Sequence, residues 1–86
     1  MRAKRVDQNH GQIVNFLRDI GCEVLDLSAV GRGCPDLLVY RPSTRLWRLV
    51  EVKVPKGKIN ALQAEFATRW PVEIVRSIDD AIKAVT

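Results

Sequence analysis

Two apolar runs that each carry charged residues constrain the fold of this chain more than any other feature. The first run is Asp36-Leu-Leu-Val-Tyr40, and the second is Leu49-Val-Glu-Val-Lys-Val54. Runs this rich in Val and Leu predict strands with at least one buried face. A carboxylate or an ammonium group in such a strand is costly unless it has a charged partner or a metal ion. The fold therefore has to bring compensating groups to Asp36, Glu51 and Lys53.

The segment between the two runs predicts a β-hairpin. It reads Arg41-Pro-Ser-Thr-Arg45, and Pro and Ser are typical of turns. A turn centred on the middle of this segment places Tyr40 opposite Trp47. The same register places Asp36 opposite Glu51, whereas a slip of one residue would move the side chains of one strand to the other face.

This register gathers three charged side chains on one face of the hairpin. Side chains alternate along a strand, so Glu51 and Lys53 share a face. The pairing adds Asp36 to that face, with directly opposed side chains about 5 Å apart. Two carboxylates this close repel each other, which favours a divalent cation between them. The alternative is a buried ion network without chemistry, which contributes little net stability for its desolvation cost.

These residues also match a known signature. Pro35-Asp36 followed by Glu51-Val52-Lys53 resembles the PD-(D/E)xK nuclease superfamily, and the sequence around it resembles the virus-type replication-repair nuclease (VRR-NUC) branch. The surrounding matches are Gly31–Val39, with two glycines before the acidic residue, and Leu62-Gln63-Ala-Glu-Phe66 after the lysine. The resemblance extends from about Asp7 to the final helix. It implies a Mg²⁺- or Mn²⁺-dependent deoxyribonuclease that hydrolyses phosphodiester bonds.

The resemblance further implies a role for each residue of the signature. Asp36 and Glu51 would be carboxylate ligands of the metal, and the backbone carbonyl of Val52 would be a further ligand. Lys53 would orient or help deprotonate the attacking water and offset charge in the transition state. Such roles agree with general chemistry, because hard cations take oxygen ligands and a bound metal acidifies water and polarises a phosphoryl oxygen.

Two helices are expected to approach this site. The resemblance places a glutamine, here Gln63, near the catalytic centre. An alternative is that Gln63 bonds back to the backbone of Asn60, the expected N-cap. We expect the apolar stripe of this helix to face inward; its members are Ile59, Leu62, Phe66 and Trp70.

The first helix is expected over about 7–20, with Asp7 as its N-cap and Gly21 after its end. Its apolar stripe is formed by Ile13, Phe16, Leu17 and Ile20. Members of the family often carry an acidic residue of this helix in the site. Here the inward flank offers Asn9 and Gln12 as possible contributors.

Composition favours a DNA partner. The chain has 86 residues and a formal net charge of +4. Arg32, Lys56 and Lys58 flank the predicted site, where they are candidates for phosphate contacts; as alternatives, any of them is an ordinary solvated charge. A chain this short buries only a marginal core, which favours oligomerisation. We expect a homodimer that presents two sites to a branched substrate such as a four-way (Holliday) junction.

Several other features exclude function classes. Cys22 and Cys34 lack metal-ligand spacing and His10 is the single histidine, which disfavours a zinc site. His10 is interpreted as a surface residue. The absence of a signal sequence and of a membrane span predicts reduced thiols and a cytoplasmic location in a bacterial host cell, with a phage or prophage as a candidate source. Three functions follow: a structure-selective endonuclease acting in replication or repair, a degenerate DNA-binding or assembly module, and, disfavoured by length, a sequence-specific restriction-type nuclease.

The predicted architecture is one α/β domain over residues 1–86, with the element order α-β-β-β-α-β-α. Strands are expected at about 23–27, from 36 to the hairpin turn, at 46–54 and at 72–75. Ser77 is expected to cap a last helix with a buried stripe of Ile78, Ala81, Ile82 and Val85. Such an order suits a small mixed sheet flanked by helices, and it agrees with the restriction-endonuclease-like core that the resemblance implies.

Overall fold

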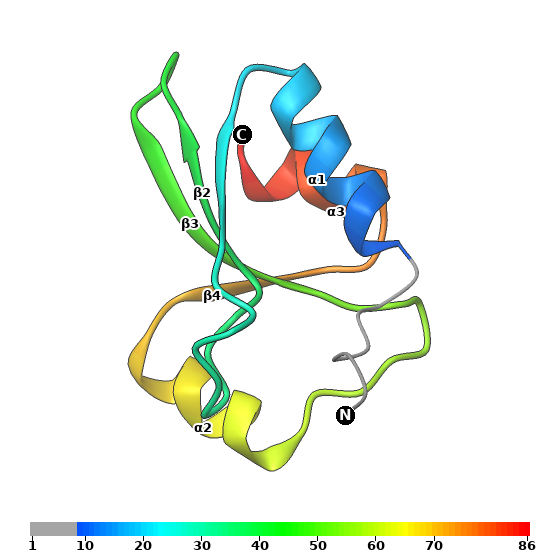
Figure 1. The fold of residues 1–86 in the computed structure, drawn as a ribbon, viewed down its shortest axis with the longest axis vertical. Coiled ribbons are helices and arrows are strands. Elements are labelled where there is room, and N and C mark those ends of the chain that lie inside the picture. Colours follow the sequence, from blue (N-terminus) through cyan, green and yellow to red (C-terminus); the bar gives the residue numbers. More distant parts are fainter. Residues whose placement is uncertain (1–8) are drawn as a thin grey trace.

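The computed structural model describes residues 9–86 and confirms the predicted order of elements (Figure 1). The elements are α1 (His10–Asp19), β1 (Glu23–Asp26), β2 (Leu37–Arg41), β3 (Leu46–Val52), α2 (Ala61–Arg69), β4 (Val72–Val75) and α3 (Ile78–Ala84). The fold is the expected mixed α/β arrangement, a four-stranded sheet flanked by helices. Within residues 9–86, no helix has the length and apolar character needed to cross a membrane.

The sheet has the strand order β1-β2-β3-β4. The first three strands are antiparallel and β4 runs parallel to β3. The hairpin has the predicted register, since Tyr40 pairs with Trp47 and Leu37 pairs with Val50. Its turn is closed by Arg45 in a left-handed conformation with φ of 56°. The register that predicted the carboxylate pair is therefore confirmed.

The core lies between one face of the sheet and the helices α1 and α3, which lie side by side on that face (Figure 1). Ile13 and Leu17 of α1 are buried, as the stripe predicted. Gly21 takes φ of 95° just after this helix, also as predicted. The buried apolar residues are Ile13, Leu17, Cys22, Leu37, Val39, Val50, Val52, Val75, Ala81, Ala84 and Val85.

Three details of the helices differ from the prediction. Asp7, the predicted N-cap of the first helix, lies outside the described residues, and the residue before the first helical residue is Asn9. In α3, Ile82 is 40% exposed and Ala84 is buried instead. The reason is geometric: the side of α3 that faces the sheet passes through Ala81 and Ala84, three residues apart, and Ile82 lies about 100° around the helix from Ala81. Ile20, at the end of the first stripe, is partly exposed.

Helix α2 lies away from the other two helices, beside the loop that precedes β2 (Figure 1). It buries no residue, so the prediction that its apolar stripe is covered is wrong. Leu62 is 56% exposed and Trp70 is 53% exposed. The sheet face opposite α1 and α3 is also partly uncovered, and Trp47 of β3 is 59% exposed there. We call this surface the outer face; it comprises Leu25, Leu38, Trp47, Leu49 and Trp70.

Candidate active site

The loop 28–35 positions the first acidic residue. Three consecutive residues of this loop, Gly31, Arg32 and Gly33, have positive φ values of 78°, 58° and 80°. This left-handed run turns the chain so tightly that Gly33 lies directly against the start of α2. A Cβ atom at Gly33 would lie 2.3 Å from the carbonyl oxygen of Leu62. Only glycine permits this approach, which therefore fixes the loop against α2.

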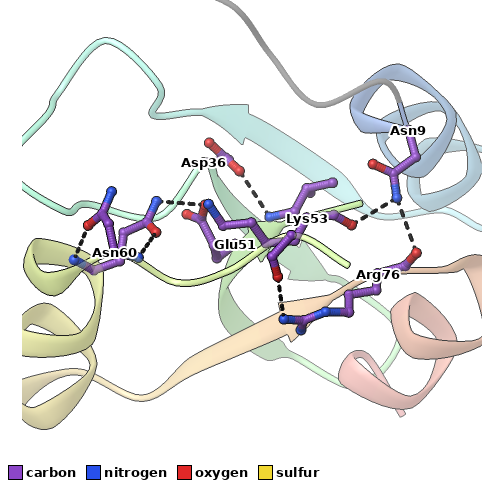
Figure 2. Close-up of polar contacts among 9 residues, drawn as sticks. Asn9, Asp36, Glu51, Lys53, Asn60 and Arg76 are labelled. Carbon is purple, nitrogen blue, oxygen red and sulfur yellow. Dashed lines mark hydrogen bonds and ion pairs between the residues drawn. The ribbon is translucent and has the colours of Figure 1, made fainter. Parts of the chain in front are cut away.

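Asp36 follows this loop and is held by both its backbone and its side chain. Its carbonyl oxygen accepts a hydrogen bond from the backbone N–H of Leu27 at 2.7 Å. Its Oδ2 accepts one from the backbone N–H of Val52 at 2.9 Å (Figure 2). The N–H and C=O groups of one strand residue point to the same side of the strand. The carbonyl of Val52 is therefore directed toward the side on which Asp36 lies.

Glu51 is the centre of the polar cluster, although it is only 4% exposed. Its Oε2 lies 3.4 Å from Nζ of Lys53 and accepts a hydrogen bond from Nε2 of Gln63 at 2.9 Å (Figure 2). Glu51 belongs to the outer face by strand alternation, but the loop 28–35 and α2 cover this end of the sheet. The charge-compensating partners that the sequence required are thus present.

Gln63 combines the two interpretations that the sequence left open. Its Oε1 accepts a hydrogen bond from the backbone N–H of Asn60 at 3.0 Å, and Asn60 caps α2 by accepting from the N–H of Gln63 at 2.9 Å. This reciprocal pair is a capping box. Nε2 of Gln63 takes no part in this cap and donates to Glu51. The cap therefore also fixes the side chain that contacts the carboxylate.

These groups line one cavity of about 320 Å³. Its walls are His10, Ser28, Gly31, Arg32, Gly33, Cys34, Asp36, Glu51, Val52, Lys53, Asn60, Leu62 and Gln63. Among them is the thiol of Cys34, whose pKa is raised by burial and by the negative charges of Glu51 and Asp36. The structure thus brings together Arg32 and all of the predicted catalytic residues and metal ligands.

Four predicted residues lie elsewhere. Lys56 and Lys58 are exposed on the loop 54–60 and do not line this cavity. Gln12 is exposed and lines a separate hollow, together with Asn9. The side chain of Asn9 contacts the backbone of Lys53 rather than either carboxylate.

His10 lines the cavity, although the sequence suggested only a surface residue. Its Nε2 is buried and has no hydrogen-bond partner in the described part of the chain. Tertiary packing, which the sequence pattern does not specify, brings His10 to the cavity. With Asp7 as the cap, His10 would already lie in the first turn of the helix, so the prediction missed the packing of this turn beside the end of β3 rather than the position of His10 in the helix. With Asn9 before the first helical residue, His10 begins the helix and lies at the edge of the site.

The residues present fit a hard divalent cation. The carboxylates of Asp36 and Glu51 and the carbonyl of Val52 are oxygen donors, which Mg²⁺ and Mn²⁺ prefer. Residues 9–86 contain no cluster of three or more His, Cys, Asp or Glu side chains that could hold a metal. Two carboxylates and one carbonyl would form a small ligand set, and such a set suits a metal that retains several water ligands.

Comparison with known proteins identifies the fold family. A family model described as the VRR-NUC domain matches residues 4–70, which is more than half of the chain. A solved structure described as a VRR-NUC domain is similar to this one, with a TM-score of 0.68 and 29% sequence identity. The similarity covers 87% of this chain and 91% of that structure's chain. Among curated proteins, the search found no match. With the acidic pair and the lysine arranged as described, the chain belongs to the VRR-NUC domain family, a family with a nuclease-type fold.

Proposed function

We propose that this protein is a metal-dependent, structure-selective DNA endonuclease that hydrolyses phosphodiester bonds. The observation that carries the proposal is the cavity in which Asp36 lies beside β3 and Glu51 contacts both Lys53 and Gln63. Membership of the VRR-NUC family supports nuclease chemistry. A four-way junction in phage or mobile-element replication and repair is the substrate that we propose.

The residues of the cavity have different proposed roles in the reaction. Asp36, Glu51 and the Val52 carbonyl would hold Mg²⁺ or Mn²⁺, which supplies Lewis acidity toward the phosphoryl oxygen and the attacking water. The ammonium group of Lys53 offsets negative charge that develops on the phosphate and orients the water. Gln63 holds Glu51 in place through its Nε2 hydrogen bond. The small protein ligand set leaves space for the substrate phosphate.

DNA contacts are proposed for Arg32, Lys56 and Lys58. Arg32 lines the cavity while its backbone occupies the left-handed region, at φ of 58°. That conformation costs a non-glycine residue about 1–2 kcal/mol. A cost of this kind at the rim of a site is typical of functional residues. The two lysines lie on the loop that directly follows Lys53, where they extend the positive surface away from the cavity.

A homodimer is the proposed working form. The outer face exposes a contiguous apolar surface that includes two tryptophans, Trp47 and Trp70. Apolar surfaces of this kind typically mark interaction sites. A second copy related by a two-fold axis would cover it with the same residues. Two cavities would then face the two strands that a junction resolvase has to cut.

The experiment that tests the proposal is cleavage of a DNA panel: linear duplex, single strand, flap and four-way junction. Each is incubated with Mg²⁺, Mn²⁺ or EDTA, and Lys53→Ala is compared with wild type. We expect cleavage that requires metal, that is highest on the junction and that Lys53→Ala reduces at least about a hundredfold. Lys83→Ala, which removes an exposed lysine of α3, is the matched control and should retain activity.

One observation favours a second candidate, a degenerate DNA-binding or assembly module with the same fold. Residues 9–86 offer two clustered carboxylates rather than a larger acidic group, and no acidic side chain of α1 lines the cavity. The same panel decides between the two functions. Binding to branched DNA without cleavage in either metal would replace the nuclease with this module.

A further inference from the structure

Two residues outside the cavity, Asn9 and Arg76, hold the chain segment that carries the lysines; we name them the brace. We propose that the brace positions the backbone of Lys53 and the loop 54–60 for catalysis. This inference rests on the proposed function and adds positioning residues to it. Neither side chain lines the cavity.

Asn9 acts at the point where β3 and β4 separate. The last hydrogen bond between these strands runs from the N–H of Lys53 to the carbonyl of Val75, at 3.0 Å. Beyond it, Nδ2 of Asn9 donates to the carbonyl of Lys53 at 3.0 Å and to the carbonyl of Arg76 at 3.1 Å (Figure 2). Because both acceptors are carbonyls, the NH₂ group of the amide is the only part of this side chain that can serve both. One side chain therefore continues the ladder past its last backbone bond.

Helix capping does not explain Asn9. The residue occupies the N-cap position of α1, but its side chain makes no capping hydrogen bond. A capping side chain works through its oxygen. Here Oδ1 is buried without a hydrogen-bond partner in the described residues, while the nitrogen is fully engaged. The side-chain contacts of Asn9 thus hold the segments that follow β3 and β4 and do not cap the helix.

Arg76 holds the same segment at a second point. Its guanidinium donates to the carbonyl of Gly57 at 2.8 Å (Figure 2), and its backbone N–H donates to Oδ2 of Asp80 at 2.9 Å. Gly57 lies between Lys56 and Lys58, so this bond holds the stretch of backbone that carries the two lysines. The bond also engages a guanidinium that would otherwise be a candidate for phosphate binding. The brace thus ties the loop 54–60 to the starts of α1 and α3.

The first test is amide hydrogen exchange on the protein without metal or DNA. Asn9→Asp keeps a good N-cap residue but presents a carboxylate to two carbonyls. Arg76→Lys keeps the charge but lacks the planar guanidinium that reaches Gly57. In both variants we expect exchange at Lys53 and Gly57 to accelerate about tenfold or more. Amides of β2 should keep their wild-type rates. Arg69→Lys, at an exposed arginine of α2, is the control. Asn9→Ser replaces the aspartate variant if that variant does not fold.

The second test is cleavage of the preferred substrate. Misplacing a catalytic group reduces turnover, so Asn9→Asp should lower kcat about tenfold or more and change KM less than about twofold. Arg76→Lys should lower kcat and also raise KM, because the bond it loses holds Gly57 between the two proposed DNA contacts, Lys56 and Lys58. If Arg76 instead bound phosphate, Arg76→Ala would lower the slope of log Kd against log salt concentration by about 1. A lower salt slope for Arg76→Ala, or unchanged exchange at Lys53 and Gly57 in the brace variants, would show that Asn9 and Arg76 do not hold this segment. Faster exchange with unchanged kcat would overturn the role of the brace in catalysis. If wild type cleaves no DNA, the proposed function fails, and exchange alone decides whether the brace exists.

Discussion

Three charged residues of the cavity were recognisable from sequence because their charges conflict with their apolar surroundings. Asp36, Glu51 and Lys53 lie in or beside strands, and the turn between the strands fixed their register. His10 could not be found in the same way. Its place at the edge of the site depends on how the start of α1 packs beside the end of β3, which no local pattern specifies. The contact between Gln63 and Glu51 depends on packing that no local pattern specifies.

A comparison of Arg32 with Arg45 separates the effect of a positive charge at the cavity from the effect of a strained backbone. Both have left-handed backbones, with φ of 58° and 56°, but Arg32 lines the cavity and Arg45 closes the hairpin turn. Replacement of either by glycine should change the free energy of unfolding by less than about 1 kcal/mol, because relief of strain offsets the added freedom of the unfolded chain. Arg32→Gly alone should weaken junction binding and lower the salt slope of log Kd by about 1. Equal losses for the two variants in binding titrations would contradict the phosphate contact.

The thiol of Cys34 reports on the charge of the site. Burial, Glu51 and Asp36 raise its pKa above the ordinary value of 9.0, so at pH 8 it has less of the reactive thiolate than an exposed cysteine. Glu51→Gln removes one negative charge, which lowers this pKa and should accelerate alkylation by iodoacetamide severalfold. Peptide mass spectrometry resolves Cys34 from the buried Cys22, whose rate should not change. An unaltered Cys34 rate would show that Glu51 does not influence the thiol.

At the scale of elements, the sequence predicted which elements exist better than which of their faces are covered. The strand β4 has the predicted bounds, and Asn60 and Ser77 cap their helices as expected. The apolar stripe of α2 was also visible, yet α2 buries no residue. Periodicity shows that one side of a helix is apolar, but it does not show whether another element packs on that side.

The contact between the loop 28–35 and α2 gives a prediction at this scale. Gly33→Ala introduces a Cβ atom that meets the backbone of Leu62, whereas a Cβ at Gly31 meets no atom within 4 Å. Both substitutions place alanine at a positive φ, which costs about 1–2 kcal/mol. Gly33→Ala should therefore lower the free energy of unfolding in urea more than Gly31→Ala, and it should also reduce cleavage. Equal destabilisation by the two variants would mean that α2 moves aside without cost.

At the scale of the whole molecule, the exposed outer face predicts self-association. Trp47→Ser combined with Trp70→Ser should raise the dimer dissociation constant at least about tenfold, which corresponds to about 1.4 kcal/mol. Sedimentation at several protein concentrations measures this constant. Ile82→Ser removes a partly exposed apolar side chain from α3 and should leave association unchanged. A wild-type protein that sediments as a monomer while it cleaves junctions would rule out the dimer.

The brace consists of contacts that are expected to form late in folding. Its two Asn9 bonds join residues 44 and 67 positions apart in the sequence, whereas the hairpin that carries Glu51 closes over a short turn. Contacts between distant residues require more loop-closure entropy and tend to form later than local ones. A folding chain would therefore acquire its acidic pair before its lysine segment is fixed. Nascent protein with a complete hairpin would then lack the proposed nuclease activity, which would arise only with the last tertiary contacts.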